Sequence, residues 1–292
     1  MNSVGVSTLL QASVTGLLLG ALFALAALGL SLVLGVMRLV NLVHGELVVL
    51  GAYTSYLLLE HVGVDPLVGL VLVALIMTVL AYPIQTVLLR PLSGRGEEAP
   101  LLTTFALSII AQNLLVAFLS GDTRSIDRPY VRGRFQVGGL TFPYVYLIGA
   151  AISLVLFAAV YLLINRAAFG LRLRASAEDP IAASVVGVAV RSVHARTYAL
   201  AGAVAGIGGA LLGMAFSFTP TSGTEYLLTG FAVVVLGGLG SVQGTLAGGL
   251  ALGLVESLGA AVFGDGYRMF IGLVVFLVFL AVRPQGLFGR TA

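Results

Sequence analysis

The chain has 292 residues, of which 59% are hydrophobic and only 9% are charged. Soluble domains carry about 25% charged residues, so this composition indicates a protein whose solvent is lipid. Cysteine is absent, which excludes disulfides and cysteine metal sites, and there is no Lys, which excludes the phosphate-binding Walker A loop. The net charge of +3 is better explained by arginines in membrane loops than by nucleic-acid binding.

Nine hydrophobic segments follow one another along the chain, and a spanning helix needs about 20 apolar residues. The first is predicted to be a retained membrane helix, because "MNSVGVSTLL" lacks the basic start of a cleaved signal peptide. The segments cover 14–36, 46–59, 67–89, 101–119, 145–164, 198–218, 226–236, 245–263 and 270–282. We therefore predict an all-α polytopic membrane protein with eight or nine such segments, forming a single domain over residues 1–292.

The two short segments, 46–59 and 226–236, occupy corresponding places in the chain. Each lies between two long segments, one further segment follows each set, and 145–164 separates the two sets. This order predicts an inverted-topology repeat. Short, Gly-interrupted segments at matched positions indicate where a transporter binds its substrate.

The arginines predict an orientation in the membrane. Cytoplasmic loops carry an excess of Arg, and we expect the loop 165–196 to be cytoplasmic. If successive loops then lie on alternate sides of the membrane, five of the 15 arginines are outside and ten are inside. The five are Arg124, Arg128, Arg132, Arg134 and Arg268. The prediction is an N-terminus outside, a C-terminus in the cytoplasm and an outer loop at 120–142.

Polar residues open the first short segment, "VNLVHGELVVLGAY". Asn41, His44 and Glu46 precede its apolar part and Tyr53 ends the motif, so all four are candidates for lining a pathway. A charged side chain at the bilayer centre costs roughly 2.5–3.5 kcal/mol. Glu46 therefore either favours a helix N-terminus, where the dipole stabilises an anion, or lines or gates a pathway.

The second short segment lies within "FTPTSGTEYLLTGFAVVVLGGLGSVQG". Pro220 and Gly223 break the preceding helix, Glu225 begins the apolar run, and glycines end it. The broken helix would expose backbone N–H and carbonyl groups that suit a zwitterion. The "GGLGSVQG" run lacks the strand–helix context of a nucleotide site. We take as pathway candidates Glu225, Gly237, Gly238 and Gly240.

Glu256 is the deepest acid in a clear span. It is either functional, as intramembrane acids often are, or a neutral or hydrogen-bonded side chain packed between helices. No spacing of Ser, His or acids implies a catalytic site, and the three His are too far apart in sequence to suggest a metal site. We therefore expect neither enzymatic activity nor a bound metal in this chain.

The stretch "SAEDPIAASVVG" (176–187) has the ends of one short helix. Asp179 is a good N-cap, Pro180 fits the first helical position, and Gly187 fits the C-terminal end. Ile181, Ser184 and Val185 are predicted to share one face. An ordinary interfacial helix would explain this pattern, but it would leave the small residues without a partner.

Four motifs resemble one protein family. They are "NLVHGELVVLGAY", "AFGLRLRASAEDPIAASVVGV", "VVLGGLGSVQGTLAGGLALGLVE" and "RPQGLFGR". Together they resemble, in one register over nearly the whole chain, the bacterial inner-membrane permeases of ATP-binding-cassette (ABC) importers for branched-chain amino acids. Val43 and Val188 depart from the usual Ala and Ile. Permeases for urea and short amides are close relatives, so the motifs leave the substrate open among these classes.

The resemblance implies one half of a two-permease pore, with an identical or paralogous second permease. It implies cytoplasmic ATPase subunits that bind the ATP and dock on a coupling helix at 178–187, and a substrate-binding protein at the outer face, for which the loop 120–142 is a candidate contact. It implies no cofactor on this chain. The alternative is a stand-alone transporter driven by protons through Glu46 or Glu256. The coupling candidates are Glu178, Asp179, Pro180, Ala182, Ala183 and Gly187.

Overall fold

The computed structural model describes residues 5–92, 94–96, 98–283 and 286–288. The main helices are α1 (Val6–Met37), α2 (His44–Leu57), α3 (Pro66–Pro83), α4 (Glu98–Leu119), α6 (Tyr144–Arg166), α7 (Ala168–Glu178), α9 (Val190–Ala215), α10 (Gly223–Gly237), α11 (Val242–Phe263) and α12 (Arg268–Val282). Seven helical stretches among the described residues are long and apolar enough to cross a membrane. The predicted all-α polytopic membrane protein is confirmed.

Shorter elements connect these helices. The π-helical turns η1 (Leu58–Val62) and η2 (Ile84–Leu89) extend α2 and α3, and the 3₁₀ turns η3 (Arg90–Leu92) and η4 (Asp265–Tyr267) follow α3 and precede α12. The helices α5 (Pro129–Arg132) and α8 (Pro180–Val185) lie in loops. The antiparallel strands β1 (Arg134–Val137) and β2 (Leu140–Pro143), paired Arg134 to Pro143, were not expected from the sequence.

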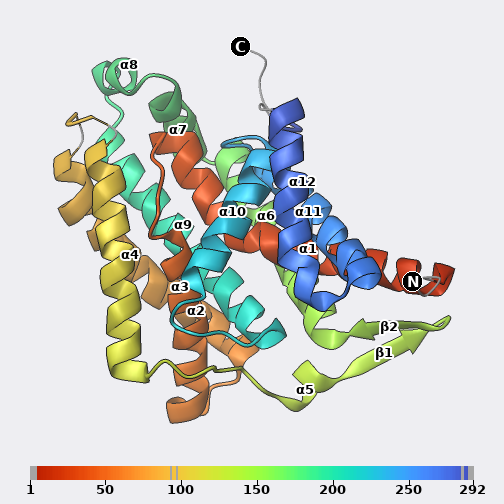
Figure 1. The fold of residues 1–292 in the computed structure, drawn as a ribbon. Helices are drawn as coiled ribbons and strands as arrows, with labels where there is room; N and C mark the ends of the chain where they lie inside the picture. The colour runs from red at the N-terminus through yellow and green to blue at the C-terminus, as the bar shows by residue number, and fades with distance from the viewer. Residues whose placement is uncertain (1–4, 93, 97, 284–285, 289–292) are drawn as a thin grey trace.

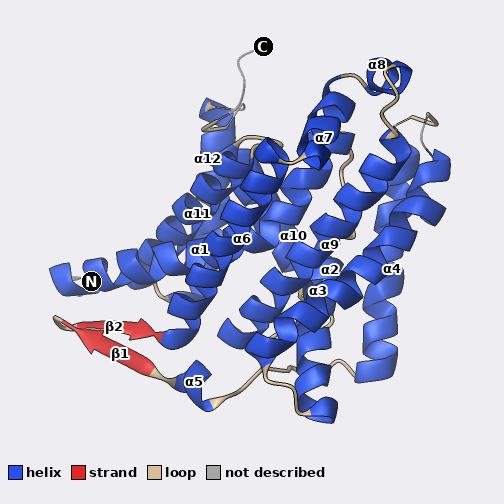
Figure 2. Ribbon diagram, turned by 180° about the vertical axis from the view of Figure 1, so that it is seen from behind, coloured by secondary structure: helices blue, strands red, loops and turns tan. Residues whose placement is uncertain are grey.

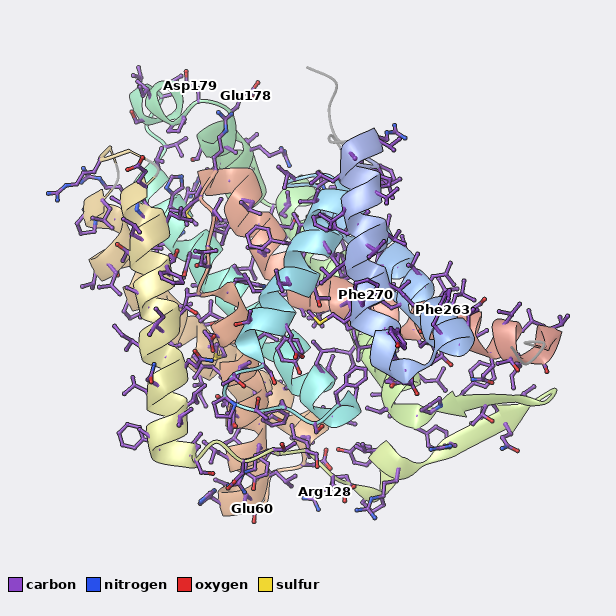
Figure 3. All side chains as sticks on the ribbon, viewed as in Figure 1. Glu60, Arg128, Glu178, Asp179, Phe263 and Phe270 are labelled. Atoms are coloured by element: carbon purple, nitrogen blue, oxygen red, sulfur yellow. The ribbon has the colours of Figure 1, made fainter. Side chains whose placement is uncertain are left out.

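The molecule has two distinct ends (Figures 1 and 2). One end, which we call the α8 end, contains α7, α8 and the C-terminal end of α12. The opposite end, which we call the hairpin end, contains α5 and the β1–β2 hairpin. Figure 3 labels Glu178 and Asp179 at the first and Glu60 and Arg128 at the second. The predicted grouping of the 165–196 loop with the C-terminal side, opposite the 120–142 loop, agrees with this arrangement.

Helices α1 and α9 form the centre of the bundle. The protein itself buries 83% of the most apolar part of each, against 39% or less in the other five candidate spans. A helix that is apolar on all sides belongs in such a core. Helix α1 packs along α11, α9 packs along α3, and the two central helices pack on each other.

Small residues allow these helix pairs to approach closely. On α1, a Cβ on Gly16 would lie 2.7 Å from the Gly253 carbonyl oxygen, and one on Gly20 would lie 2.7 Å from the Leu250 Cα. On α9, a Cβ on Gly206 would lie 2.5 Å from the Met77 side chain. Because lipid provides no hydrophobic drive between helices, such close packing supplies much of the attraction that holds them together.

The packing is reciprocal between the two halves of the chain. The first long helix of each half, α1 or α9, is central and packs on the third helix of the other half, α11 or α3. This exchange is what an inverted repeat would produce. The repeat stays a prediction, and the arrangement of the helices favours it.

Polar contacts hold the hairpin end together. Gln11 of α1 accepts a hydrogen bond from the Thr141 N–H at 2.7 Å, and the Tyr130 hydroxyl donates to Asp65 at 3.0 Å. Burial and that carboxylate raise the pKa of Tyr130 to about 12, so its hydroxyl stays protonated and can donate. A hydrogen bond from Arg132 holds the pKa of Asp127 below its usual value.

Candidate translocation site and docking helix

The two short helices begin beside each other, deep inside the bundle. Nε2 of His44, the first residue of α2, lies 2.8 Å from the carbonyl oxygen of Ala26, well inside α1. A Cβ on Gly45 would collide with the carbonyl oxygen of Gly223, the first residue of α10. From this shared level α2 runs to the hairpin end and α10 to the α8 end (Figure 1). The predicted short segments are therefore two half-length helices whose N-termini meet.

Glu46 lies at the N-termini of both short helices. It belongs to the first turn of α2, and its carboxylate contacts Gly223, where α10 begins. Each helix N-terminus behaves as about +0.5 of an elementary charge, so the Glu46 carboxylate is stabilised by both. The first turn of α10 also carries Glu225, which is exposed. Its Oε1 lies 3.4 Å from the Ser108 hydroxyl of α4, whereas Oε2 has no partner among the described residues. The geometry favours the helix-terminus role of Glu46 and leaves one oxygen available.

The other first-motif candidates are buried in or just before α2. Asn41, His44 and Glu46 are at most 2% exposed, and Tyr53 is 1% exposed. Asn41 accepts a hydrogen bond from Tyr198 at 3.3 Å, and the Tyr53 ring packs edge-on against Phe218 at 5.0 Å between centroids. His44, Glu46 and Tyr53 lie along α2, with Tyr53 about two turns beyond Glu46, and Asn41 lies in the loop before it.

The remaining candidates of the second short segment lie at the two ends of α10. Glu225 is in the first turn of α10, two residues after Gly223, and its side chain is exposed. The predicted glycines Gly237, Gly238 and Gly240 lie at the far end of α10, where Gly237 packs on Gly244 of α11 and Gly240 packs on Gly35 of α1. Because neighbouring backbone lies so close to these positions, a larger side chain would not fit there. These three are packing and turn residues and do not join the Glu46 group.

Glu256 also lies apart from Glu46. It is 5% exposed and wedged between α11 and α12, where a Cβ on Gly272 would lie 2.6 Å from its carboxylate. The geometry favours the second interpretation of this residue, a side chain packed between helices.

Two cavities flank the meeting point of the short helices. One of about 680 Å³ opens at the hairpin end between α2, η1 and the end of α4. The other, of about 1020 Å³, opens at the α8 end between η2, the start of α4 and the start of α9. Between them, Thr104 of α4 accepts a hydrogen bond from the Leu42 N–H at 3.3 Å, and Ser108 contacts Glu46. Helix α4 therefore borders both cavities and the closed region between them.

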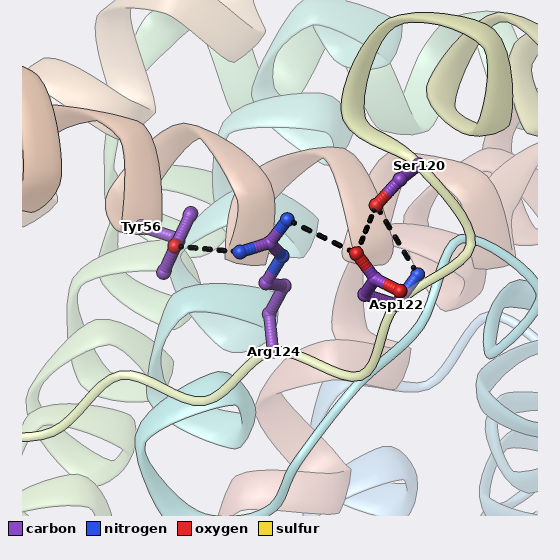
Figure 4. A network of polar contacts seen from close by, with 4 residues as sticks. All are labelled: Tyr56, Ser120, Asp122 and Arg124. Atoms are coloured by element: carbon purple, nitrogen blue, oxygen red, sulfur yellow. Dashed lines mark hydrogen bonds and ion pairs between the residues drawn. The ribbon is translucent and has the colours of Figure 1, made fainter.

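The cavity at the hairpin end contains a charged group that sequence reasoning missed. Arg124 donates to the Tyr56 hydroxyl at 3.2 Å, and its guanidinium lies 3.6 Å from Asp122, which accepts from Ser120 at 2.6 Å (Figure 4). Backbone hydrogen bonds of 2.8 Å in both directions join Arg124 to Phe218. The sequence signal was an Arg two residues after an Asp at the end of a span, but its partners come from other segments.

The predicted docking helix exists but is shorter than expected. Residues 180–185 form α8, whereas Glu178 is the last residue of α7. Asp179 caps α8 as predicted, accepting from the N–H groups of Ile181 and Ala182, and Gly187 has the positive φ of 85° expected at a helix end. The α8 helix projects from the bundle (Figure 1).

The exposed face of α8 is apolar. Ile181 is 78% exposed, Val185 81% and Val186 78%. Ala182 is exposed too, whereas Ala183 is only 4% exposed and faces the protein, so Ala183 is not available to a partner. Three large apolar side chains are thus exposed together outside the spanning helices, as is typical of interaction surfaces, and the docking role of α8 stays a prediction.

Residues 13–281 match the family described as "Branched-chain amino acid transport system / permease component". The chain belongs to this family. The permease is 31% identical to the high-affinity branched-chain amino acid transport system permease protein BraD of Pseudomonas aeruginosa, over 96% of both chains. It is 30% identical to LivH of Escherichia coli, which carries the same description, also over 96% of both.

A second group of relatives matches less of the permease. The ribose import permease protein RbsC of Bacillus subtilis is 30% identical over 65% of this chain and 62% of its own. No solved structure matches. The names of the relatives describe permease components of larger transport systems, which does not fit the alternative of a stand-alone proton-driven transporter.

Proposed function

We propose that the permease is the membrane subunit of an ABC importer that moves branched-chain amino acids across the bacterial inner membrane. The observation that carries this proposal is the match over 96% of the chain to permeases named for that substrate. We assign ATP hydrolysis to other subunits, because a chain without Lys cannot form a Walker A loop. ATP is bound by partner ATPase subunits.

Three partners follow from this function. ATPase subunits dock on α8, whose capped, exposed and apolar surface suits a protein groove. A second permease, identical or paralogous, completes the pore. A substrate-binding protein delivers its ligand at the hairpin end, where α5 and the hairpin extend from the bundle (Figure 2).

The proposed pathway follows the α4 side of the short helices. It enters the cavity of about 680 Å³, passes the contact of Glu46 with Ser108, and leaves through the cavity of about 1020 Å³. Ser108 and Thr104 of α4 make polar contacts with Glu46 and with the Leu42 N–H just before α2, so a small displacement of α4 would open the region between the cavities. ATP hydrolysis by the ATPase subunits docked on α8 would supply the energy for that displacement.

Uptake into proteoliposomes tests the function. The permease, co-purified with its ATPase subunits and second permease and supplied with its binding protein, should accumulate radiolabelled leucine only when the ATPase side has ATP. Accumulation should survive a proton ionophore. Uptake by the permease alone that collapses with the proton gradient, or uptake of ribose in place of leucine, would contradict the proposal.

The orientation is tested with single cysteines, since the chain has none of its own. We propose that the α8 end faces the cytoplasm. A membrane-impermeant maleimide applied to spheroplasts should label Val137→Cys on β1 rapidly, and should label Ser184→Cys on α8 only after the membrane is permeabilised. Both positions are exposed in the permease itself, and the permease is expressed without its ATPase subunits, so that no docked partner covers Ser184. The reverse pattern would place the N-terminus inside.

A further inference from the structure

The cavity at the hairpin end has walls of two kinds. Apolar side chains of α4 form one part, including Val116 and Phe118, and Leu57 adds to it from α2. Polar groups form the rest, namely Tyr53, Tyr56, Glu60, His61, Ser120 and Arg124. The cavity thus combines an apolar face with several polar groups, and in small-molecule sites such polar groups fix the orientation of the ligand.

Arg124 is held in place but has hydrogen-bonding capacity to spare. Its backbone is fixed by two hydrogen bonds to Phe218, and the Phe218 ring packs on Tyr53. Its guanidinium has five N–H donors. Among the described residues these make one hydrogen bond, to Tyr56, and one longer ion pair, to Asp122. The carbon of the guanidinium also lies 5.6 Å from the centre of the Tyr56 ring, which restricts its position.

A buried polar group at the same wall is without a partner. The Tyr53 hydroxyl makes no hydrogen bond within the described residues, although Tyr53 is 1% exposed and borders the cavity. An unpaired buried hydroxyl costs free energy that a ligand atom can recover. Tyr53 and Arg124 are joined through Phe218, so both groups are positioned by the same contacts.

We propose that this cavity binds the substrate as an α-amino acid zwitterion. Arg124 binds the carboxylate, assisted by the Tyr53 hydroxyl, Glu60 binds the ammonium group, and the apolar wall of α4 receives the branched side chain. A guanidinium pairs with a carboxylate in two-pronged geometry. The two charges also disfavour an uncharged sugar, the substrate named for the ribose relative. The inference rests on the proposed function and adds a binding site to the permease itself.

Protection of a cysteine tests the site without the binding protein. Val116→Cys, in the cavity wall, is alkylated in the purified permease assembly, with Arg124 either native or replaced. Leucine should slow the alkylation, whereas leucinamide, which lacks the carboxylate, and 4-methylpentanoate, which lacks the ammonium, should not. Arg124→Gln should raise the leucine concentration needed for protection by about 10–100-fold, the loss typical of a charged hydrogen bond. Arg124→Lys keeps the charge and should retain part of the protection.

The control is Arg134→Gln, which removes the same charge from the exposed strand β1, away from the cavity. It should leave protection unchanged. Equal protection by leucine and leucinamide, or undiminished protection in a folded Arg124→Gln assembly, would overturn the site. So would an Arg124→Gln defect confined to association with the binding protein. In each case ATP-driven leucine uptake by the native assembly would still support the proposed function, whereas its absence would remove that function too.

Discussion

Gly45→Ala should disrupt the centre of the permease even though it adds a single methyl group. The new Cβ would collide with the Gly223 carbonyl oxygen and approach the Leu227 Cβ to 2.9 Å. Neither neighbour can rotate away, since one is backbone and the other is attached directly to it. Overpacking of this kind typically costs about 1–3 kcal/mol, and separating α2 from α10 would also move Glu46 away from the α10 N-terminus.

The measurement is thermal unfolding in detergent, followed by circular dichroism because the chain contains no Trp. We expect Gly45→Ala to lower the midpoint by about 5 °C or more and to abolish ATP-driven uptake. Gly69→Ala on α3 is the matched control, because its nearest new neighbour would be Val64 at an ordinary 3.5 Å. Alanine is favoured over glycine within helices by about 0.8–1.0 kcal/mol, so Gly69→Ala should be neutral or stabilising. Equal effects of the two changes would refute this account of the contact.

Ile181→Asp combined with Val185→Asp should detach the ATPase subunits while leaving the permease folded. Both side chains are more than three-quarters exposed, so their replacement removes no internal contact. At an interface, however, central apolar residues contribute about 2 kcal/mol or more each, and a new charge would have to be buried. We expect ATPase co-purification to fall by at least about tenfold, with uptake falling in proportion.

Two comparisons make the docking experiment specific. Val137→Asp places a charge on an exposed apolar residue of the hairpin and should leave ATPase co-purification unchanged. Asp179→Ala with Pro180→Gly removes the cap of α8 but not its apolar face. Cap loss costs roughly 0.5–2 kcal/mol, so that variant should show a partial defect. Full ATPase binding by the double-aspartate variant would place the docking surface elsewhere.

The sequence predicted what depends on local chemistry. Asp179, Pro180 and Gly187 each act within a few residues, so their positions alone located both ends of α8. The short segments were recognisable because glycine and proline interrupt the apolar runs. The sequence did not show that Glu178 ends α7 or that Ala183 faces the bundle, since helix boundaries and buried sides depend on tertiary packing. Their role in ATPase coupling stays a prediction. The β1–β2 hairpin has strands of four residues, too short for alternation to reveal.

Contacts between distant segments could not be predicted in the same way. Hydropathy gives the length of α2 and α10 but not the meeting of their N-termini, which depends on Gly45 and Gly223 approaching each other across the bundle. Arg124 was counted only as one of the outer arginines. Its position against Tyr56, Asp122 and Phe218 arises from three separate parts of the chain. The pathway role of Gly237, Gly238 and Gly240 stays a prediction, because glycine looks alike in sequence whether it lines a pathway or packs against backbone, and the structure shows the packing.

The central place of α1 has a consequence for biosynthesis. It is synthesised before its main packing partner, α11, which begins roughly 200 residues later in the chain. At the usual 5–20 residues per second, that gap lasts roughly 10–40 s. During this time α1 must reside in lipid with its glycine face uncovered. It carries no charged residue, and its most apolar 18-residue stretch has a mean hydropathy of 2.6, so it is stable in lipid before α11 arrives. The apolar composition of α1 thus serves two stages. It keeps the isolated helix stable in lipid during synthesis, and it fills the centre of the bundle after folding.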